Sequence, residues 1–284
     1  MRSIVPFIFV LIWSTGFIVA RAASPHADLD MFLLLRFTAT AAILGAAAML
    51  AKVRWPRGRE MRHHLLAGIL MQGIYLCASY WAIVHGLAAG VMALLGALQP
   101  LFTALASTLL GNRLGRQTWA GLAVGLVGVC FVLLPRLLAN DANALPPIAV
   151  IAALVSIISI TVGTMMQKSA HAGGDIRAVG AIQNIGGALV AACFIAVLGT
   201  WHVRPDPILV AALGWSVIIV SVIGINLLVW MVRHGEATRA TTLLLLSPPL
   251  SAVEAYLLFG ETLSAIQIAG FVLALSGVLL ARRG

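Results

Sequence analysis

Two stretches of this chain match one another: residues 85–128 read HGLAAGVMALLGALQPLFTALASTLLGNRLGRQTWAGLAVGLVG, and residues 234–277 read HGEATRATTLLLLSPPLSAVEAYLLFGETLSAIQIAGFVLALSG. A shift of 149 residues, from 85 to 234, pairs His85/His234, Gly86/Gly235, Pro100/Pro249, Gly111/Gly260, Leu114/Leu263, Gly121/Gly270 and Gly128/Gly277. Trp81 pairs with Trp230 in the same way. Earlier in each half the shift is 147, and it pairs Gly16/Gly163, Arg21/Lys168 and Asp28/Asp175. Such self-similarity indicates a duplication, and it predicts two repeats over residues 1–140 and 141–284.

The composition places both repeats in a membrane. Of the 284 residues, 61% are hydrophobic and 10% are charged, whereas soluble domains carry about 25% charged residues. Long apolar runs of this kind can each cross a bilayer as a helix. The runs predict ten spans, at 3–20, 31–51, 64–84, 90–110, 117–134, 147–168, 176–198, 207–232, 240–259 and 264–281.

The positive charges predict the orientation of these spans. With a cytoplasmic N-terminus, the inner side carries Arg2, Lys52, Arg54, Arg57, Arg59, Arg62, Arg113, Arg116, Lys168, Arg177, Arg233, Arg239, Arg282 and Arg283. The outer side carries only Arg21, Arg136 and Arg204. Because cytoplasmic loops are enriched in Lys and Arg, both termini are expected in the cytoplasm. The net charge of +9 then faces anionic lipid, and no nucleic-acid partner is expected.

Five spans per repeat is an odd number, so the second repeat should enter the membrane inverted. Inverted repeats are typical of alternating-access transporters, whose sites lie near the membrane midplane beside interrupted helices. Pro100 interrupts the fourth span, and Pro248 and Pro249 interrupt the ninth. Proline removes a backbone donor, so these positions are interpreted as hinges that line a hydrated central cavity.

The segments LIWSTGFIVARAA near the N-terminus, Arg36–Phe37, and the pattern P…LLFGE.L…Q..G..L.L.GV.L over 249–279 resemble the drug/metabolite transporter superfamily. The resemblance covers essentially the whole chain and is closest to its ten-span EamA-type exporters, including the aromatic amino acid exporters. It implies an all-α membrane protein of the bacterial inner membrane. Asn112 departs from the pattern, because the second repeat has Glu261 at that place.

Two charged side chains lie deep in the predicted spans. Arg36 and Glu254 sit at similar depth, and we expect them either to pair with one another or to face one outward cavity. An unpaired charge in lipid costs roughly 2–3 kcal/mol or more. A structural ion pair, a substrate-attracting arginine and a proton-carrying glutamate all remain open.

Polar and aromatic residues within the spans supply the other candidates. The predicted substrate-binding residues are Trp13, Gln72, Tyr75, Ser79, Tyr80, Trp81, Gln99, Ser159, Gln183, Asn226, Trp230 and Ser247. His85 and His234 are candidates for gating or proton coupling, although such residues can also simply end a helix. Aromatic walls with amide and hydroxyl groups suit an amino acid with an apolar side chain, and they would also suit a cation.

Other features carry no chemistry. Cys77, Cys130 and Cys193 have neither metal-ligand nor CxxC spacing, and the sequence contains no phosphate-binding loop, so no cofactor or metal is expected. The glycines of spans 5 and 10 predict close helix packing within each repeat or a dimer face, so a monomer and a homodimer both remain open.

These observations predict a transporter that exports amino acids or related small metabolites. The alternative within transporters is multidrug or quaternary-amine export, for which Glu254 would be essential. An intramembrane enzyme would need clustered acids or histidines, and a scaffold subunit would have no use for polar groups at mid-depth in both repeats.

Overall fold

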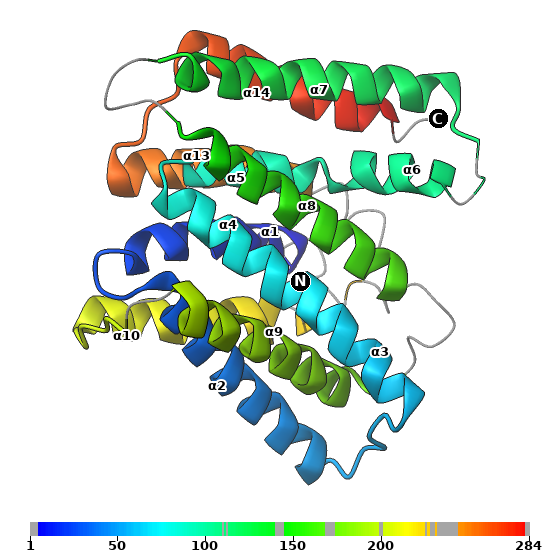
Figure 1. The fold of residues 1–284 in the computed structure, drawn as a ribbon, viewed down its shortest axis with the longest axis vertical. Coiled ribbons are helices and arrows are strands. Elements are labelled where there is room, and N and C mark those ends of the chain that lie inside the picture. Colours follow the sequence, from blue (N-terminus) through cyan, green and yellow to red (C-terminus); the bar gives the residue numbers. More distant parts are fainter. Residues whose placement is uncertain are drawn as a thin grey trace.

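The computed structural model describes residues 5–109, 111, 113–139, 145–167, 174–198, 201–224, 226–227, 231 and 244–281. Within these ranges every regular element is a helix (Figure 1). The first predicted repeat, residues 1–140, contains α1 (Val5–Ala23), α2 (Leu29–Leu50), α3 (Arg59–Gly68), the π-helix η1 (Ile69–Ile74), α4 (Tyr75–Val84), α5 (Ala89–Ala97), α6 (Gln99–Leu109) and α7 (Arg116–Leu137). The second contains α8 (Pro147–Gln167), α9 (Ile176–Leu198), α10 (Pro207–Gly214), the π-helix η2 (Trp215–Gly224), the 3₁₀ turn η3 (Leu244–Leu246), α13 (Ser247–Phe259) and α14 (Ala265–Ala281).

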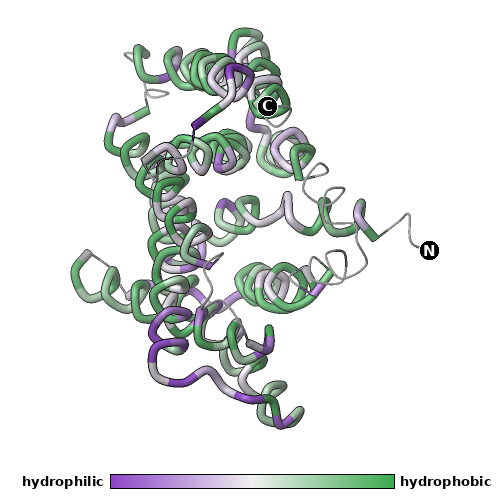
Figure 2. Tube along the Cα trace, turned by 90° about the vertical axis from the view of Figure 1, so that its right-hand side faces the viewer, coloured by the Kyte–Doolittle hydropathy of each residue, from purple (hydrophilic) through white to green (hydrophobic). Residues whose placement is uncertain are grey.

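Eight helical segments of the described chain are long and apolar enough to cross a membrane. They coincide with the first eight predicted spans to within a few residues, with two exceptions. The third begins five residues early at Arg59, and the eighth ends, within the described residues, at Gly224, eight residues before its predicted end at 232. Two further apolar helices, Leu244–Phe259 and Ala265–Ala281, are shorter. Hydrophobic residues cover most of the helices, and hydrophilic ones gather in loops, at helix ends and in α3 (Figure 2). The all-α membrane class is therefore confirmed.

Both proline positions lie in the first turn of a helix. The helical path breaks at Leu98 between α5 and α6, and Pro100 is the second residue of α6. Pro248 and Pro249 lie in the first turn of α13, directly after η3. In a first turn the missing N–H would have no intrahelical partner in any case, so proline starts a helix at little cost. The matched Gly111 and Gly260 have φ angles of 86° and 68°, which glycine adopts readily when it ends a helix.

Glycines join equivalent helices of the two repeats. A Cβ added to Gly128 of α7 would lie 2.3 Å from the backbone nitrogen of Ala274 in α14, and one on Gly121 would lie 2.5 Å from the Gly277 carbonyl. This register, in which residue numbers rise along α7 as they fall along α14, makes the pair antiparallel. The prediction that these glycines pack within a repeat or at a dimer face is wrong, because they hold α7 against α14 across the repeats.

The other contacts follow the same relation. Helices α2 and α9, which are equivalent, also pack together. They run antiparallel, with Gly180 against Leu44 and Gly187 against Phe37. The contact of η1 with α8 has its counterpart in η2 with α1, and α6 with α8 has its counterpart in α13 with α1. The α7–α14 pair forms one edge of the molecule, α2, α9 and α10 form the other, and α1 crosses between them (Figure 1).

The two π-helices also occupy equivalent places. Shifting Ile69–Ile74 by 149 residues gives 218–223, which falls inside Trp215–Gly224. A π-helix widens the turn and frees backbone groups, and it is frequent at functional sites. Hydropathy carries no signal for it, so the sequence predicts two ordinary helices here.

Candidate functional site

Four consecutive residues of α1, the segment Ser14–Phe17, contact four other helical elements. Ser14 Oγ donates to Glu254 Oε1 of α13 at 2.6 Å, and Thr15 Oγ1 accepts from Trp215 Nε1 of η2 at 2.9 Å. The Gly16 carbonyl accepts from Tyr80 Oη of α4 at 2.8 Å. The Phe17 ring lies 6.3 Å from the Tyr75 ring in an edge-on arrangement, and next to Gly96 of α5. The Ser14–Phe17 segment therefore links both repeats at the centre of the bundle.

Arg36 lies on the α2 side of this segment. It is the eighth residue of α2, so at 1.5 Å per residue it lies about 10 Å inside the helix start. Its side chain is buried, with 7% exposed. Its Nη1 donates to Tyr80 Oη at 3.0 Å, and its Nε and Nη2 donate to Ser221 Oγ at 3.3 and 3.2 Å. The guanidinium therefore bridges α4 of the first repeat and η2 of the second.

Among the described residues, the hydrogen-bond partners of Arg36 are the neutral hydroxyls of Tyr80 and Ser221. The ion pairs found among the described residues are Arg21–Glu261, His26–Asp206 and Arg177–Asp175, and none of them includes Arg36. A buried charge without a counter-ion costs several kcal/mol, and two hydroxyl oxygens offset only part of that cost. This site is therefore suited to an anion.

Glu254 lies on the other side of α1, on α13. Its Oε1 accepts from Ser14, and its Oε2 is buried without a hydrogen-bond partner among the described groups. Since α1 packs between α13 and α2 (Figure 1), the carboxylate and the Arg36 guanidinium bind different partners. The predicted Arg36–Glu254 ion pair is wrong for this conformation.

Four predicted residues lie on α4 and η1, and one of them, Tyr80, contacts Arg36. Tyr80 is fully buried and bonded to Arg36, and Tyr75 packs on Phe17. Gln72 is half-buried in η1, where its Cβ faces Gly187 of α9. Ser79 Oγ donates to the Tyr75 carbonyl at 2.7 Å, so its hydroxyl proton is already bonded within its own helix.

A second group lies where α8 meets the first repeat. Gln99 Nε2 donates to Thr164 Oγ1 at 2.8 Å, and Ser159 Oγ donates to the Leu70 carbonyl of η1 at 2.8 Å. The serine thereby binds a carbonyl of the π-helix. Gln183 of α9 lies with its backbone against Gly68 of α3, and its side-chain Nε2 is buried without a partner among the described groups.

The remaining candidates are dispersed. Trp13 is 39% exposed and lies 5.4 Å from the Phe9 ring. Trp81 stacks on His85 at 3.6 Å near the end of α4, where His85 Nδ1 also contacts the Trp81 carbonyl at 2.8 Å. Asn226 donates to the Val222 carbonyl, and Ser247 is buried at the start of α13. Trp230 and His234 lie outside the described residues.

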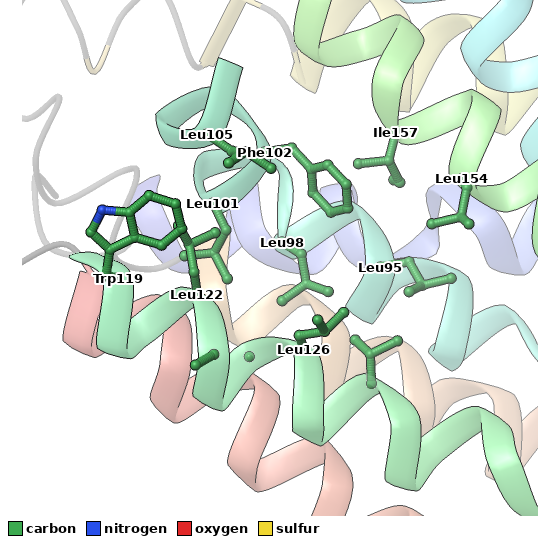
Figure 3. Close-up of a pocket in the computed structure, with 13 residues that line it drawn as sticks. Leu95, Leu98, Leu101, Phe102, Leu105, Trp119, Leu122, Leu126, Leu154 and Ile157 are labelled. Carbon is green, nitrogen blue, oxygen red and sulfur yellow. The ribbon is translucent and has the colours of Figure 1, made fainter. Parts of the chain in front are cut away.

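The hollows beside the prolines are apolar. A hollow of about 330 Å³ lies between the α5–α6 break, α7 and α8, and is lined by Leu98, Phe102, Trp119 and other apolar side chains (Figure 3). Its counterpart of about 350 Å³ lies between α1 and α13 and includes Pro249. The sequence predicts hydrated breaks instead. The difference follows from helix starts, where proline leaves no additional polar group that needs water.

The predicted substrate-binding residues do not include Ser14, Thr15, Gly16, Phe17, Trp215 and Ser221 of this arrangement. Trp215 and Ser221 belong to η2, and only the three-dimensional path of the π-helix brings them to α1 and α2. The match of Gly16 with Gly163 was the one available signal. Among the described residues, no group of three or more His, Cys, Asp or Glu could hold a metal ion.

Comparisons with known proteins agree with this architecture. The model of the EamA-like transporter family matches residues 3–134 and again 147–283. An uncharacterized inner membrane transporter, YedA of Escherichia coli K12, is 26% identical over 92% of this chain and 84% of its own. A probable terminal-alkyne amino-acid exporter of Streptantibioticus cattleyicolor is 24% identical over 96% and 91%. A probable amino-acid metabolite efflux pump of Salmonella typhimurium is 24% identical over 95% and 91%.

A solved crystal structure shares the fold. It superposes with a TM-score of 0.62 at 22% sequence identity, and the match covers 99% of this chain and 97% of that one. Together with the apolar helices and the inner membrane relative, these matches identify the chain as a multi-pass protein of the inner membrane.

Proposed function

Because the chain belongs to the EamA-like transporter family, we propose that it exports amino acids or related small carboxylate-bearing metabolites by alternating access. The observation that carries the proposal is the Arg36 guanidinium, which is buried in the bundle and has Tyr80 and Ser221 as its hydrogen-bond partners among the described residues. A substrate carboxylate would neutralise the charge of Arg36 through a bidentate contact, which suits guanidinium geometry. The relatives named as amino-acid exporters support the substrate class.

The proposed architecture has ten spans in two inverted repeats, residues 1–140 and 141–284, with both termini in the cytoplasm. The antiparallel pairing of equivalent helices α7–α14 and α2–α9 supports the inversion. The breaks at Pro100 and Pro248–Pro249 would serve as hinges, since short helix-terminal segments absorb such changes. Ser24→Cys and Arg59→Cys, each introduced singly, should react with an impermeant maleimide from opposite sides of the membrane. Reaction from one side would exclude this topology.

The transport test compares two substrates and two arginines. Proteoliposomes would be loaded with labelled L-phenylalanine or with phenethylamine, which lacks the carboxylate. We expect Arg36→Gln to slow phenylalanine efflux at least tenfold, because ~1.4 kcal/mol of lost binding already gives that factor. Arg177→Gln is the matched control, since Arg177 pairs with Asp175 at the start of α9. Efflux that survives in Arg36→Gln would refute the role of Arg36.

Glu254 favours a second candidate, export of quaternary amines. Its carboxylate lies near α1 with no cation among its described partners, so an organic cation could pair with it. In that case Glu254→Gln should abolish efflux of labelled tetraphenylphosphonium, while Arg36→Gln leaves it unchanged. Phenylalanine efflux that depends on Arg36, without tetraphenylphosphonium efflux, would exclude this candidate.

A further inference from the structure

The apolar hollow beside the α5–α6 break is a groove on the surface of the bundle. It lies between α6, α7 and α8 and has a volume of about 330 Å³ (Figure 3), within the roughly 300–1,000 Å³ of small-molecule sites. Leu105, Leu126 and Leu154 line it with 42%, 65% and 40% of their surfaces exposed. Because all three lie in helices that are long and apolar enough to span a membrane, the solvent at the mouth of this groove is the acyl chains of the bilayer.

The length of the groove along α7 matches one leaflet of a bilayer. Its lining residues on this helix run from Trp119 to Val129, which is about 15 Å at 1.5 Å per residue. The hydrocarbon core of a bilayer is about 30 Å thick, so each leaflet contributes about 15 Å. Trp119 marks the end of the groove nearest the start of α7, and tryptophan is enriched where a span meets the lipid headgroups. The groove therefore has the length of an acyl chain whose headgroup lies at the start of α7.

Two cations lie at this headgroup end. Arg116 is the first residue of α7 and stands three residues before Trp119, which places both side chains on one face of the helix. Arg113 lies in the loop just before α7, and both arginines are exposed. Neither of them belongs to an ion pair found among the described residues. This end of the groove therefore attracts an anion.

The equivalent hollow of the second repeat has the apolar lining without these charges. Leu101, Leu154 and Ile157 of the first hollow correspond to Leu250, Phe7 and Val10 of the second. The positions equivalent to Arg113, Arg116 and Trp119 are Thr262, Ala265 and Ile268. The helix packing that both halves share does not require the two arginines. The difference favours an anionic ligand at the first hollow alone.

We propose that this groove binds one acyl chain of an anionic phospholipid from the predicted inner leaflet, with the lipid phosphate at Arg113 and Arg116. The inference does not depend on the transported substrate. A zwitterionic lipid carries an ammonium group beside its phosphate, which offsets the attraction of the arginines, so an anionic headgroup is preferred. The bound chain would pack α6 against α7 and α8 next to the break at Leu98, and a ligand of the folded state raises its stability.

The test measures lipid binding to the purified, delipidated protein by native mass spectrometry. The probes are dioleoylphosphatidylglycerol, dioleoylphosphatidylcholine, lysophosphatidylglycerol, which has a single acyl chain, and glycerol phosphate, which has none. An arginine near an anionic lipid surface contributes about fivefold to affinity, so phosphatidylglycerol should bind at least about fivefold more tightly than phosphatidylcholine. Lysophosphatidylglycerol should bind nearly as tightly as the two-chain lipid, because the groove takes one chain. Millimolar glycerol phosphate should not displace either of them.

Matched pairs of arginine variants assign the headgroup end. Arg113→Gln with Arg116→Gln should remove the preference for phosphatidylglycerol. Arg54→Gln with Arg57→Gln removes the same charge from exposed positions of the α2–α3 loop and should keep the preference. Both pairs change exposed side chains, so the fold should be retained, and unfolding temperatures measured without lipid verify this.

A second pair of variants assigns the acyl chain. Ala123 lines the groove, so Ala123→Trp should fill it and weaken the binding of both phospholipids severalfold. Val127 lies on α7 outside the lining and is 47% exposed, so Val127→Trp adds the same ring to the lipid-facing surface and should have no effect.

Four outcomes would overturn the proposal. The first is equal affinity for phosphatidylglycerol and phosphatidylcholine in the unmodified protein. The second is a preference that survives the loss of Arg113 and Arg116 or disappears with Arg54 and Arg57. The third is unchanged lipid binding in Ala123→Trp. The fourth is a dimer that Ala123→Trp dissociates, which would assign the groove to a second copy of this chain.

Discussion

The two ends of the bundle differ at positions that the duplication makes equivalent. At the predicted outer end, Arg21 and Glu261 form an ion pair between the repeats. The equivalent residues for the inner end are Lys168 and Asn112, which lie outside the described residues and include no carboxylate. The helix packing repeats in both halves, whereas the charges do not. The predicted repeats are therefore alike in helix packing and differ in the charged side chains at their ends.

A second contact of the outer end has no charged counterpart either. His26 pairs with Asp206, and the backbones of Ala27 and Val203 form an antiparallel bridge between the loops. The positions equivalent to His26 and Asp206 are Gly173 and Arg57, which cannot form an ion pair. Two independent contacts therefore tie the repeats at one end.

The largest effect on stability is expected at the α7–α14 pair, where the predicted repeats are most alike. Gly128→Ala places a Cβ 2.3 Å from the Ala274 nitrogen, and Gly277→Ala places one 2.4 Å from the Gly125 nitrogen. Overpacking of this kind costs about 1–3 kcal/mol, so both variants should unfold at clearly lower temperature in detergent. Gly214→Ala meets nothing within 4 Å and is the control. A large effect at only one of the two glycines would break the symmetry of the α7–α14 pair.

The next effect tests a difference between the repeats. Arg36 and Tyr80 bind each other, whereas the equivalent residues are Gln183 and Val229. Tyr80→Phe removes one of the two hydroxyls that solvate the guanidinium. A hydrogen bond to a charged group contributes about 1.5–3 kcal/mol, so amino-acid efflux should fall about tenfold. Tyr256→Phe, at a residue 57% exposed, should change nothing, and an equal loss in both variants would contradict the role of Tyr80.

The sequence predicts much of the fold and less of the site. Apolar runs and matched glycines predict the helices and the breaks, because hydropathy and backbone conformation depend on the local sequence. The Arg36–Tyr80–Ser221 contact joins residues 44 and 185 positions apart, and the π-helix that presents Ser221 leaves no hydropathy signal. The positions of Arg36 and Glu254 along their predicted spans place the two residues at similar depth in the membrane. These positions do not show that α1 lies between them.

A substitution that makes the two ends alike should have a smaller effect on transport. Asn112→Glu introduces a carboxylate at the position equivalent to Glu261, with Lys168 at the position equivalent to Arg21. An exposed ion pair contributes about 0.2–1 kcal/mol, so transport should slow by no more than about fivefold. A cysteine at the inner end should also become less accessible. Asn112→Gln keeps the size without the charge and should have no effect; slowing by both variants would indicate a steric cause.

The smallest effect is expected on the pH dependence of stability, through the loops at the predicted outer end. Asp206 caps α10: its carboxylate accepts from the Leu209 backbone N–H at 2.8 Å. This hydrogen bond, together with His26, holds the pKa of Asp206 below its usual range, which is about 3.9. A carboxylate with a lowered pKa stabilises the folded state above its unfolded pKa, and this contribution is lost as pH falls through the folded pKa. The unfolding temperature of the unmodified protein should exceed that of Asp206→Asn at pH 5, and the gap should close below pH 4.

His26→Gln separates the two main causes of the lowered pKa of Asp206, which are the Leu209 N–H and the His26 imidazole. It keeps the Leu209 cap and removes only the imidazole, so its gap at pH 5 should be smaller than that of Asp206→Asn. Other carboxylates titrate alike in all three proteins, so the differences isolate this contact. A gap that persists unchanged to pH 2.5 would mean that Asp206 acts through shape rather than charge. The outer end would then be held by the Arg21–Glu261 pair and the backbone bridge alone.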